Sequence, residues 1–365
     1  MRILLVTANP VDTAGGVERF CRMLMDVCKE KGWKVDVLTP AHIAGHLVSV
    51  NALKELYWTY RLGHLIKQPG KSYDYDVVIS NGVWGAWVPS TVPHINVYHG
   101  TWVGNYTSKE RLTVKQQVGK AIRAWLEKRS GKFAVNVAVS ESTKREIERY
   151  YKLKVDAVIE NAVDIKGFSP PPYEKKPQLK QDLGVPPDKP IFLYVGRMEY
   201  GKGIDRFNEL ASRINDGTSV RASFVVLTPQ VVPRYYQTSI HYIIGDNPEK
   251  IRLTYQAADA LLFPSRYEGY EFVTIEALAS GLPVLGTAVG AMAMLKQRDE
   301  MLGEYILDSY DHEAMHALIE RYLDLSEDKR QALSERARCY AEKWANMERF
   351  KEAWTKLIRE VAGRE

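Results

Sequence analysis

Short apolar runs alternate with longer amphipathic segments along the chain, and the two kinds of segment predict different elements. Segments 17–31 and 51–67 predict helices; in the second, Leu53, Tyr57 and Tyr60 recur at helical spacing. Six apolar runs in the first half predict strands at 3–7, 35–39, 77–80, 95–98, 135–139 and 155–160. Strands that are apolar on both faces and separated by helices indicate a parallel sheet.

A proline-rich, charged stretch at 166–177 interrupts this rhythm and predicts a linker. The alternation then resumes. Strands are predicted at 191–195, 223–227, 241–244, 260–263 and 283–286, and helices at 204–214, 273–280, 311–325, 327–344 and 347–361. The pattern therefore predicts two α/β domains, at 1–165 and 178–346.

Composition narrows the class of protein. The chain has 365 residues, of which 45% are hydrophobic and 26% charged, so a disordered or fibrous protein is excluded. A net charge of +5 permits an anionic partner without requiring nucleic acid. No apolar run is long enough to span a membrane, and the apolar start has no signal-peptide cleavage site.

The cysteine count bears on compartment and metal binding. Three cysteines are too few for a disulfide framework and suit a reducing cytoplasm. Cys21 and Cys28 lie seven residues apart on one predicted helix, so we expect them in the core rather than at a redox or metal site. With no Cys-x-x-Cys or paired-histidine motif, no structural zinc site is expected.

Candidate chemistry lies in the loops after strands, because ligands of open α/β sheets bind beyond the carboxyl ends of the strands. Gly15 and Gly16 open the first predicted helix, and their amides could approach an anion, although a plain turn explains an isolated glycine pair equally well. The loop is not Gly-x-Gly-x-x-Gly, which argues against a nicotinamide site. His99 ends another strand, where a lone histidine is more often structural.

Two loops of the second half carry stronger signals. Arg197 and Lys202 share one loop, where the two cations could bind a diphosphate. The alternative is that both are solvated surface charges. In the other loop Glu268 precedes a helix that begins near Phe272 and contains Glu276. The first amides of that helix can hold phosphate oxygens, and carboxylates suit ligands rich in hydroxyl groups.

Together these motifs resemble those of glycosyltransferase family 4, whose members are retaining GT-B glycosyltransferases. The resemblance implies two Rossmann-like domains with parallel sheets that face each other across a cleft, with a last helix, about 347–365, that crosses back to the first domain. The matching segments run in order along nearly the whole chain: Gly15 to Glu18, His99-Gly100, Val139-Ser140, Asn161 to Asp164, Gly196-Arg197, Lys202-Gly203, Ala258-Asp259, Pro264-Ser265, Glu268 to Glu276 and Gly281 to Val284.

The same resemblance implies roles for individual residues. The donor would be a UDP- or GDP-type sugar, with Arg197 and Lys202 on its diphosphate and Glu276 on its ribose. Glu268 would meet the transferred sugar, and His99 would reach it from the first domain. The remaining donor-binding positions are Gly15, Gly16, Phe272, Val273, Thr274 and Glu271.

Three positions depart from the family pattern. Ala162 and Ala291 each stand where the family commonly has glycine. Glu271 also replaces a usual glycine, at the start of the helix whose amides should hold the diphosphate. A carboxylate pointed inward at the diphosphate would repel it. We therefore expect Glu271 to point outward, or to bond a sugar hydroxyl or a donor amine, and to tune the choice of donor sugar.

The expected enzyme is a cytoplasmic hexosyltransferase without cofactor or metal, because protein cations can stabilise the leaving diphosphate. Two alternatives remain open: a sugar-nucleotide 2-epimerase on the same fold, and a non-catalytic sugar-nucleotide-binding protein. A phosphorylase is disfavoured by the short chain and the lack of a signal for a pyridoxal-phosphate lysine.

The acceptor is left open as a glycan, a lipid-linked molecule or another hydroxyl compound. First-domain aromatic residues suit sugar or lipid, or simply a core: Trp84, Trp87, Trp102, Tyr106 and Trp125. Segment 109–154 has 13 basic and 5 acidic residues, so peripheral contact with an anionic membrane is a hypothesis with a solvated face as its alternative.

Overall fold

The computed structural model describes residues 1–46, 51–66, 75–107, 112–215 and 220–363. The chain divides into two compact units. The first unit consists of Met1–Asn161 with Glu348–Glu365, and the second of Ala162–Met347. Residues 166–177, predicted as a linker, lie in the second unit and include the short helix η3 (Tyr173–Lys175).

The first unit is built on a six-stranded parallel sheet in the order β2-β1-β3-β4-β5-β6. Its strands are β1 (Arg2–Val6), β2 (Lys34–Leu38), β3 (Val77–Asn81), β4 (His94–Tyr98), β5 (Val135–Ala138) and β6 (Ala157–Val158). Its helices are α1 (Gly16–Glu30), α2 (Pro40–Ala44), α3 (Ala52–Ile66), α4 (Trp102–Thr107), α5 (Val114–Gly131), α6 (Glu141–Glu146) and α15 (Met347–Val361), with η1 (Gly82–Gly85) and η2 (Ile147–Tyr151).

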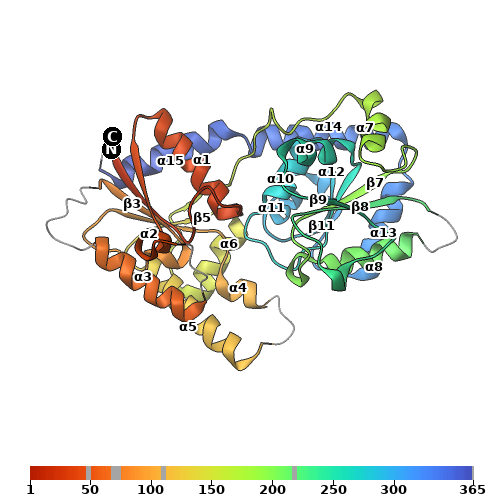
Figure 1. The fold of residues 1–365 in the computed structure, drawn as a ribbon. Helices are drawn as coiled ribbons and strands as arrows, with labels where there is room; N and C mark the ends of the chain where they lie inside the picture. The colour runs from red at the N-terminus through yellow and green to blue at the C-terminus, as the bar shows by residue number, and fades with distance from the viewer. Residues whose placement is uncertain (47–50, 67–74, 108–111, 216–219, 364–365) are drawn as a thin grey trace. The chain divides into compact units, whose positions relative to one another are not determined.

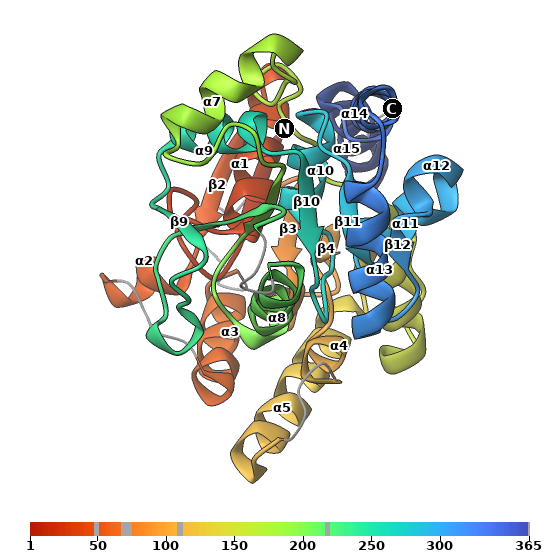
Figure 2. The ribbon, with the colours of Figure 1, turned by 90° about the vertical axis from the view of Figure 1, so that its right-hand side faces the viewer.

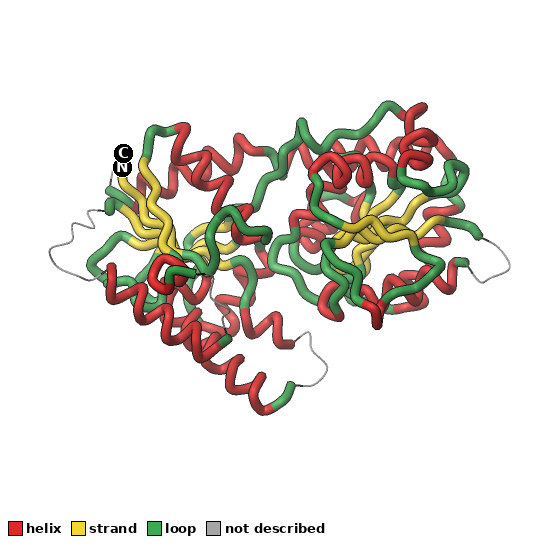
Figure 3. Tube along the Cα trace, viewed as in Figure 1, coloured by secondary structure: helices red, strands yellow, loops and turns green. Residues whose placement is uncertain are grey.

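Helices cover both faces of this sheet (Figures 1 and 3), with α1 and α15 on one face and α3 and α5 on the other. Beneath α3 and α5, Leu62 and Leu126 pack with Val78 of β3 and Trp84 of η1 in one buried cluster. On α15 itself, the Trp354 side chain is fully buried. The amphipathic pattern predicted from sequence thus serves to bury one side of each helix against the sheet.

The second unit repeats the architecture with sheet order β12-β11-β10-β7-β8-β9, again all parallel. Its strands are β7 (Ile191–Val195), β8 (Ser223–Thr228), β9 (His241–Ile244), β10 (Ala260–Phe263), β11 (Val284–Thr287) and β12 (Ile306–Leu307). Its helices are α7 (Lys176–Asp182), α8 (Ile204–Ile214), α9 (Pro248–Ala257), α10 (Phe272–Ala279), α11 (Ala291–Arg298), α12 (Glu300–Gly303), α13 (His312–Leu323) and α14 (Glu327–Trp344), with η4 (Tyr200–Lys202) and η5 (Pro233–Tyr235).

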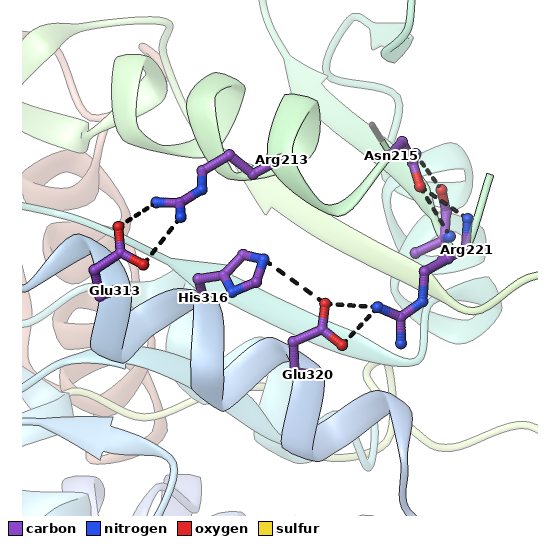
Figure 4. A network of polar contacts seen from close by, with 7 residues as sticks. Arg213, Asn215, Arg221, Glu313, His316 and Glu320 are labelled. Carbon is purple, nitrogen blue, oxygen red and sulfur yellow. Dashed lines mark hydrogen bonds and ion pairs between the residues drawn. The ribbon is translucent and has the colours of Figure 1, made fainter. Parts of the chain in front are cut away.

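In Figure 2 this unit faces the viewer, and its central strands lie between two layers of helices, with α9 and α10 on one side and α8 and α13 on the other. Ion pairs join α13 to the region around α8 (Figure 4). Arg213 at the end of α8 makes two hydrogen bonds to Glu313, at 2.6 and 2.9 Å. Arg221 reaches Glu320 at 2.6 Å, and His316 lies 3.7 Å from the same carboxylate.

The helices predicted at 17–31, 51–67, 204–214, 273–280, 311–325, 327–344 and 347–361 are confirmed to within two residues at each end. The predicted core position of two cysteines is also confirmed, because Cys21 and Cys28 are buried and unpaired in α1. Strand β12 was not predicted, because a strand of two residues is too short to show a hydrophobic pattern. No described helix is both long and apolar enough to span a membrane.

Candidate functional site

The loops after β7 and β10 in the second unit meet through an ion pair between two predicted site residues. Lys202 donates from Nζ to both carboxylate oxygens of Glu268, at 2.7 and 2.8 Å. The Glu268 side chain is 9% exposed and that of Lys202 is 32% exposed. This pair places a cation and a carboxylate that accepts hydrogen bonds together at the carboxyl edge of the sheet, where ligands of α/β proteins bind.

Arg266, which sequence analysis did not single out, fixes these two loops to each other. Its guanidinium makes two 2.7 Å bonds to Asp205 and one 2.6 Å bond to the Tyr200 carbonyl. It also lies 3.5 Å from the centre of the Tyr200 ring. The Arg266 amide bonds the Gly201 carbonyl at 2.9 Å. Such a planar fork holds the Lys202 loop in one geometry, a role that lysine cannot fill.

Gly203 is required where the Lys202 loop enters α8. Its φ is +73°, in the left-handed region that glycine adopts readily. A Cβ at this position would stand 2.2 Å from the carbonyl oxygen of Pro264 in the other loop. The glycine therefore allows the two loops to approach closely enough for Lys202 to reach Glu268.

Arg197 is placed apart from this pair. Its side chain is 69% exposed, and its guanidinium contacts Glu199 at 3.0 Å. The loop backbone is anchored beside it, because the Tyr194 hydroxyl donates to the Arg197 carbonyl at 2.8 Å. The predicted pair of cations is thus present on one loop, with Lys202 held in place and Arg197 in solvent.

Helix α10 carries the other predicted carboxylates. Glu276 is buried at 6% exposure, and its Oε2 accepts a 2.8 Å hydrogen bond from the Tyr255 hydroxyl of α9. Phe272, Val273 and Thr274 form the first turn, where backbone amides lack acceptors within the helix. The start of α10 therefore has backbone amides without acceptors inside the helix, next to two carboxylates.

Glu271 sits at the N-cap of α10 but its side chain does not cap that helix. The carboxyl group is 5% exposed, and its Oε2 accepts a 3.1 Å hydrogen bond from the Ala291 amide at the start of α11. Burial, and secondly the charge of Glu268, raise its pKa to about 8. The expected outward direction of Glu271 is therefore wrong, because its carboxyl group is buried against the start of α11. Burial favours the neutral form of this group, and its contact with a sugar hydroxyl stays a prediction.

In the first unit, Gly15 and Gly16 begin α1 as predicted, and both are exposed. The carboxylate of Glu18 folds back over this turn and accepts a 2.9 Å hydrogen bond from the Asn9 amide. A Cβ on Gly15 would lie only 1.9 Å from Glu18 Oε2. A Cβ here would therefore require the flexible Glu18 side chain to move, and both roles predicted for Gly15 stay open.

His99 follows β4 and is held as a neutral ring. Its Nε2 lies 2.7 Å from Asn81 Oδ1, so this nitrogen carries the proton and donates it. The Phe20 ring packs edge-on with centroids 4.7 Å apart, and burial lowers the pKa of His99 to about 4. Asn81 also contacts Cys21 Sγ, which fixes the amide toward His99.

The first-unit aromatic residues fall into two groups. Trp84 and Tyr106 are buried, at 6% and 5% exposure, and belong to the core. Trp125 is 48% exposed, and Trp87 and Trp102 are partly exposed. Within the described ranges, no group of three or more His, Cys, Asp or Glu side chains is placed to hold a metal ion.

Comparison with known proteins identifies the class as glycosyltransferases. The sequence model for "Glycosyl transferases group 1" matches residues 175–339, and that for "Glycosyltransferase Family 4" matches residues 14–166. The chain belongs to glycosyltransferase family 4, with the GT-B fold, as its sequence motifs predicted.

Individual relatives span most of the chain at low identity. An uncharacterised glycosyltransferase of Methanocaldococcus jannaschii is 24% identical over 80% of this chain and 82% of its own. Sucrose-phosphate synthase from Thermosynechococcus elongatus superposes with a TM-score of 0.83 at 21% identity, covering 99% of both chains. HepE from Anabaena, solved in complex with UDP-glucose, has a TM-score of 0.72 at 15% identity and covers 99% of this chain and 100% of its own.

Proposed function

We propose that this glycosyltransferase moves a hexose from a UDP- or GDP-type sugar to a hydroxyl group of a glycan, a lipid-linked molecule or another acceptor. The observation that carries the proposal is the Lys202–Glu268 pair, held beside the start of α10 by Arg266. Lysine suits a diphosphate and the paired carboxylate suits sugar hydroxyls. The complex of the structural neighbour HepE with UDP-glucose supports the same class of donor.

In this proposal each charged group has one task. Lys202 and Arg197 neutralise the diphosphate, while amides of the first turn of α10 bind its oxygens. Glu276, aligned by Tyr255, accepts hydrogen bonds from the ribose hydroxyls. Glu268 binds the transferred sugar once Lys202 moves its bonds to the phosphate. His99, whose Nε2 is engaged by Asn81, offers its Nδ1 as an acceptor toward a sugar hydroxyl, and Gly16 approaches the donor.

The reaction is proposed to retain anomeric configuration without a metal ion. None of the predicted site residues is an evident nucleophile, so same-face attack with the leaving diphosphate as base is preferred to a covalent intermediate. Catalysis then rests on orientation and on electrostatic stabilisation of the departing diphosphate by Lys202 and Arg197. Activity is accordingly expected to survive a chelator.

Release of nucleoside diphosphate tests the reaction directly. We expect release from one UDP- or GDP-sugar only when acceptor is present, at an unchanged rate in EDTA. Conversion of the donor sugar into its 2-epimer without acceptor would instead establish the epimerase. Binding of a donor without turnover across a broad acceptor panel would establish a non-catalytic protein, and a strict need for divalent ions would contradict the metal-free mechanism.

Glu271 is proposed to set the choice of donor sugar. Its buried carboxyl links the starts of α10 and α11, so its removal changes the shape and the hydrogen bonding beside Glu268. The Glu271→Gly variant should keep nucleotide affinity and change the ranking of donor sugars in a competition assay. If that variant instead gained nucleotide affinity and turnover that the parent lacks, Glu271 would be an inhibitory substitution in a degenerate protein.

The enzyme is proposed to work in the cytoplasm. Free cysteines support this location, because Cys21, Cys28 and Cys339 are all unpaired. Thiol labelling of protein from its native cells would show three free thiols, whereas a cysteine held in a disulfide to another chain would contradict the assignment.

A further inference from the structure

Two stripes of exposed apolar side chains run along neighbouring helices of the first unit. On α3, Leu53, Tyr57 and Tyr60 are 67%, 50% and 52% exposed. On α5 the corresponding stripe is Val114, Val118 and Trp125, followed by Phe133 just after the helix. These seven are among twelve large exposed hydrophobic side chains of the described residues, so exposed apolar surface is concentrated here.

Contacts between rings join the two stripes into one surface. The Tyr60 and Trp87 rings meet edge-on at 5.5 Å, and the Trp87 and Trp125 rings meet at 6.1 Å. The Arg129 guanidinium lies 4.0 Å from the centre of the Trp87 ring and 5.6 Å from that of Trp125. Figure 1 shows the two helices running side by side. We call the surface formed by these seven side chains with Trp87 and Arg129 the α3/α5 face.

On both helices the acidic side chains are buried, whereas the exposed charges are basic. Glu55 and Glu127 are the only acidic residues of α3 and α5, and both are buried, at 4% and 3% exposure. Glu55 is neutralised by Arg123, which binds it at 2.6 and 3.0 Å. Glu127 accepts hydrogen bonds from the Tyr151 hydroxyl and the Trp102 amide. The outward sides of α3 and α5 are therefore cationic, without a compensating carboxylate of their own.

Basic residues stand among the exposed rings and beside a pocket. Lys115, Lys128 and Lys132 are exposed and form no ion pair with any described carboxylate. Together, Arg129, Lys132, Trp87, Ser90 and Phe133 line part of a pocket of about 170 Å³. Cations and hydroxyl groups in the lining of one pocket are the chemistry that recognises an anionic headgroup.

We propose that the α3/α5 face docks on a bilayer that carries anionic lipids, with its aromatic rings at the level of the headgroups and its lysines on the phosphates. Exposed Trp, Tyr and Phe rings between cations match such an interface, where amphipathic helices lie in the plane of the membrane. A second copy of the chain fits worse, because two cationic faces repel each other. This docking does not depend on the proposed sugar transfer, because membrane binding is measured without donor or acceptor.

Flotation with lipid vesicles tests the docking. The parent should float with phosphatidylcholine vesicles that contain phosphatidylglycerol, and fail to float with pure phosphatidylcholine or in 0.5 M salt, given the short screening length there. Reversing three charges together, Lys115→Glu, Lys128→Glu and Lys132→Glu, should weaken partitioning at least tenfold. The matched control, Lys175→Glu with Lys250→Glu and Lys329→Glu in the second unit, changes net charge equally and should bind like the parent.

The apolar part is tested separately. Trp125→Ala with Phe133→Ser should reduce flotation several-fold, whereas Tyr236→Ala with Ile244→Ala, an equally exposed pair in the second unit, should not. Circular dichroism establishes that each variant is folded. Equal recovery of the parent with neutral and anionic vesicles would overturn the proposal, as would a control as defective as the face variants. Loss of a dimer in Trp125→Ala, with no flotation by the parent, would assign the face to a second copy instead.

Discussion

Glu271 has two carboxyl oxygens in different surroundings. Oε2 accepts a hydrogen bond from the Ala291 amide, while Oε1 is buried without a hydrogen-bond partner among the described residues. Burial, together with the nearby charge of Glu268, opposes ionisation more than the local hydrogen-bond donors favour it, and the pKa rises to about 8 from a usual 4.5. Between these values the unfolded chain has released the proton that the folded protein retains.

The sign of the resulting pH dependence follows from this difference. Because the folded state binds the extra proton, stability is lost as pH rises from about 5 to 8. Glu271→Gln removes the titration, so its stability relative to the parent should rise by roughly a few kcal/mol across that range, at about 1.4 kcal/mol per pKa unit. Urea unfolding at pH 5, 6.5 and 8 measures it. A constant difference between variant and parent at all three values would show that Glu271 titrates normally.

Lys202 is the cation whose loss should affect chemistry most. Lys202→Ala leaves Glu268 without its partner but removes no core side chain, so the fold should persist. Turnover should fall by roughly 3 kcal/mol of barrier, a factor of 10² to 10³, as for the loss of an electrostatic donor. Steady-state rates give the value, with exposed Lys250→Ala as the control in the same unit. Turnover near that of the parent would rule Lys202 out of the diphosphate grip.

At the scale of elements, α15 is fastened to α1 by aromatic packing. Trp354 is fully buried, and its ring centroid lies 5.4 Å from that of Phe20 and 6.2 Å from that of Phe350. Phe20 in turn touches His99, so this packing reaches the candidate site of the first unit. Helix α15 is thus part of the support of that site as well as the last segment of the chain.

Truncation of Trp354 should therefore be costly. Trp354→Ala is expected to destabilise the first unit by about 3–5 kcal/mol, through lost burial and the cavity left behind. Trp354→Phe should cost clearly less, because the indole Nε1 makes no hydrogen bond to any described residue. Denaturant unfolding followed by circular dichroism measures both. Equal, small losses for the two variants would show that α15 contributes little to the unit.

Elements with a strong hydrophobic period were the ones that sequence predicted well. Helix α1 was expected at 17–31 and found at Gly16–Glu30, because its apolar residues all fall on one side. No bounds were predicted for helix α5, because exposed Val114, Val118 and Trp125 interrupt the usual pattern of one buried face. That interruption is the same feature that supports the membrane-docking proposal.

At the scale of the whole molecule, motif spacing predicted the family and the GT-B fold, but contacts across distant segments could not be read from it. Tyr255 reaches Glu276 across 21 positions, and Arg266 reaches Asp205 across 61. Neither pairing has a local signal, because each depends on which loops the parallel sheet brings to one edge. The burial of Glu271 against Ala291 depends on the sheet in the same way.

Binding of the donor tests the central claim, that the second unit grips a nucleotide diphosphate sugar through Lys202. A panel of UDP- and GDP-sugars is screened by thermal unfolding of the full chain in EDTA. A ligand at 100 times its Kd stabilises by about 2.7 kcal/mol, or roughly 5–10 °C for a unit of this size. We predict such a shift for one donor in the parent and in Lys250→Ala, and its loss in Lys202→Ala. A full shift in Lys202→Ala, or no shift of the folded parent with any donor, would contradict the account.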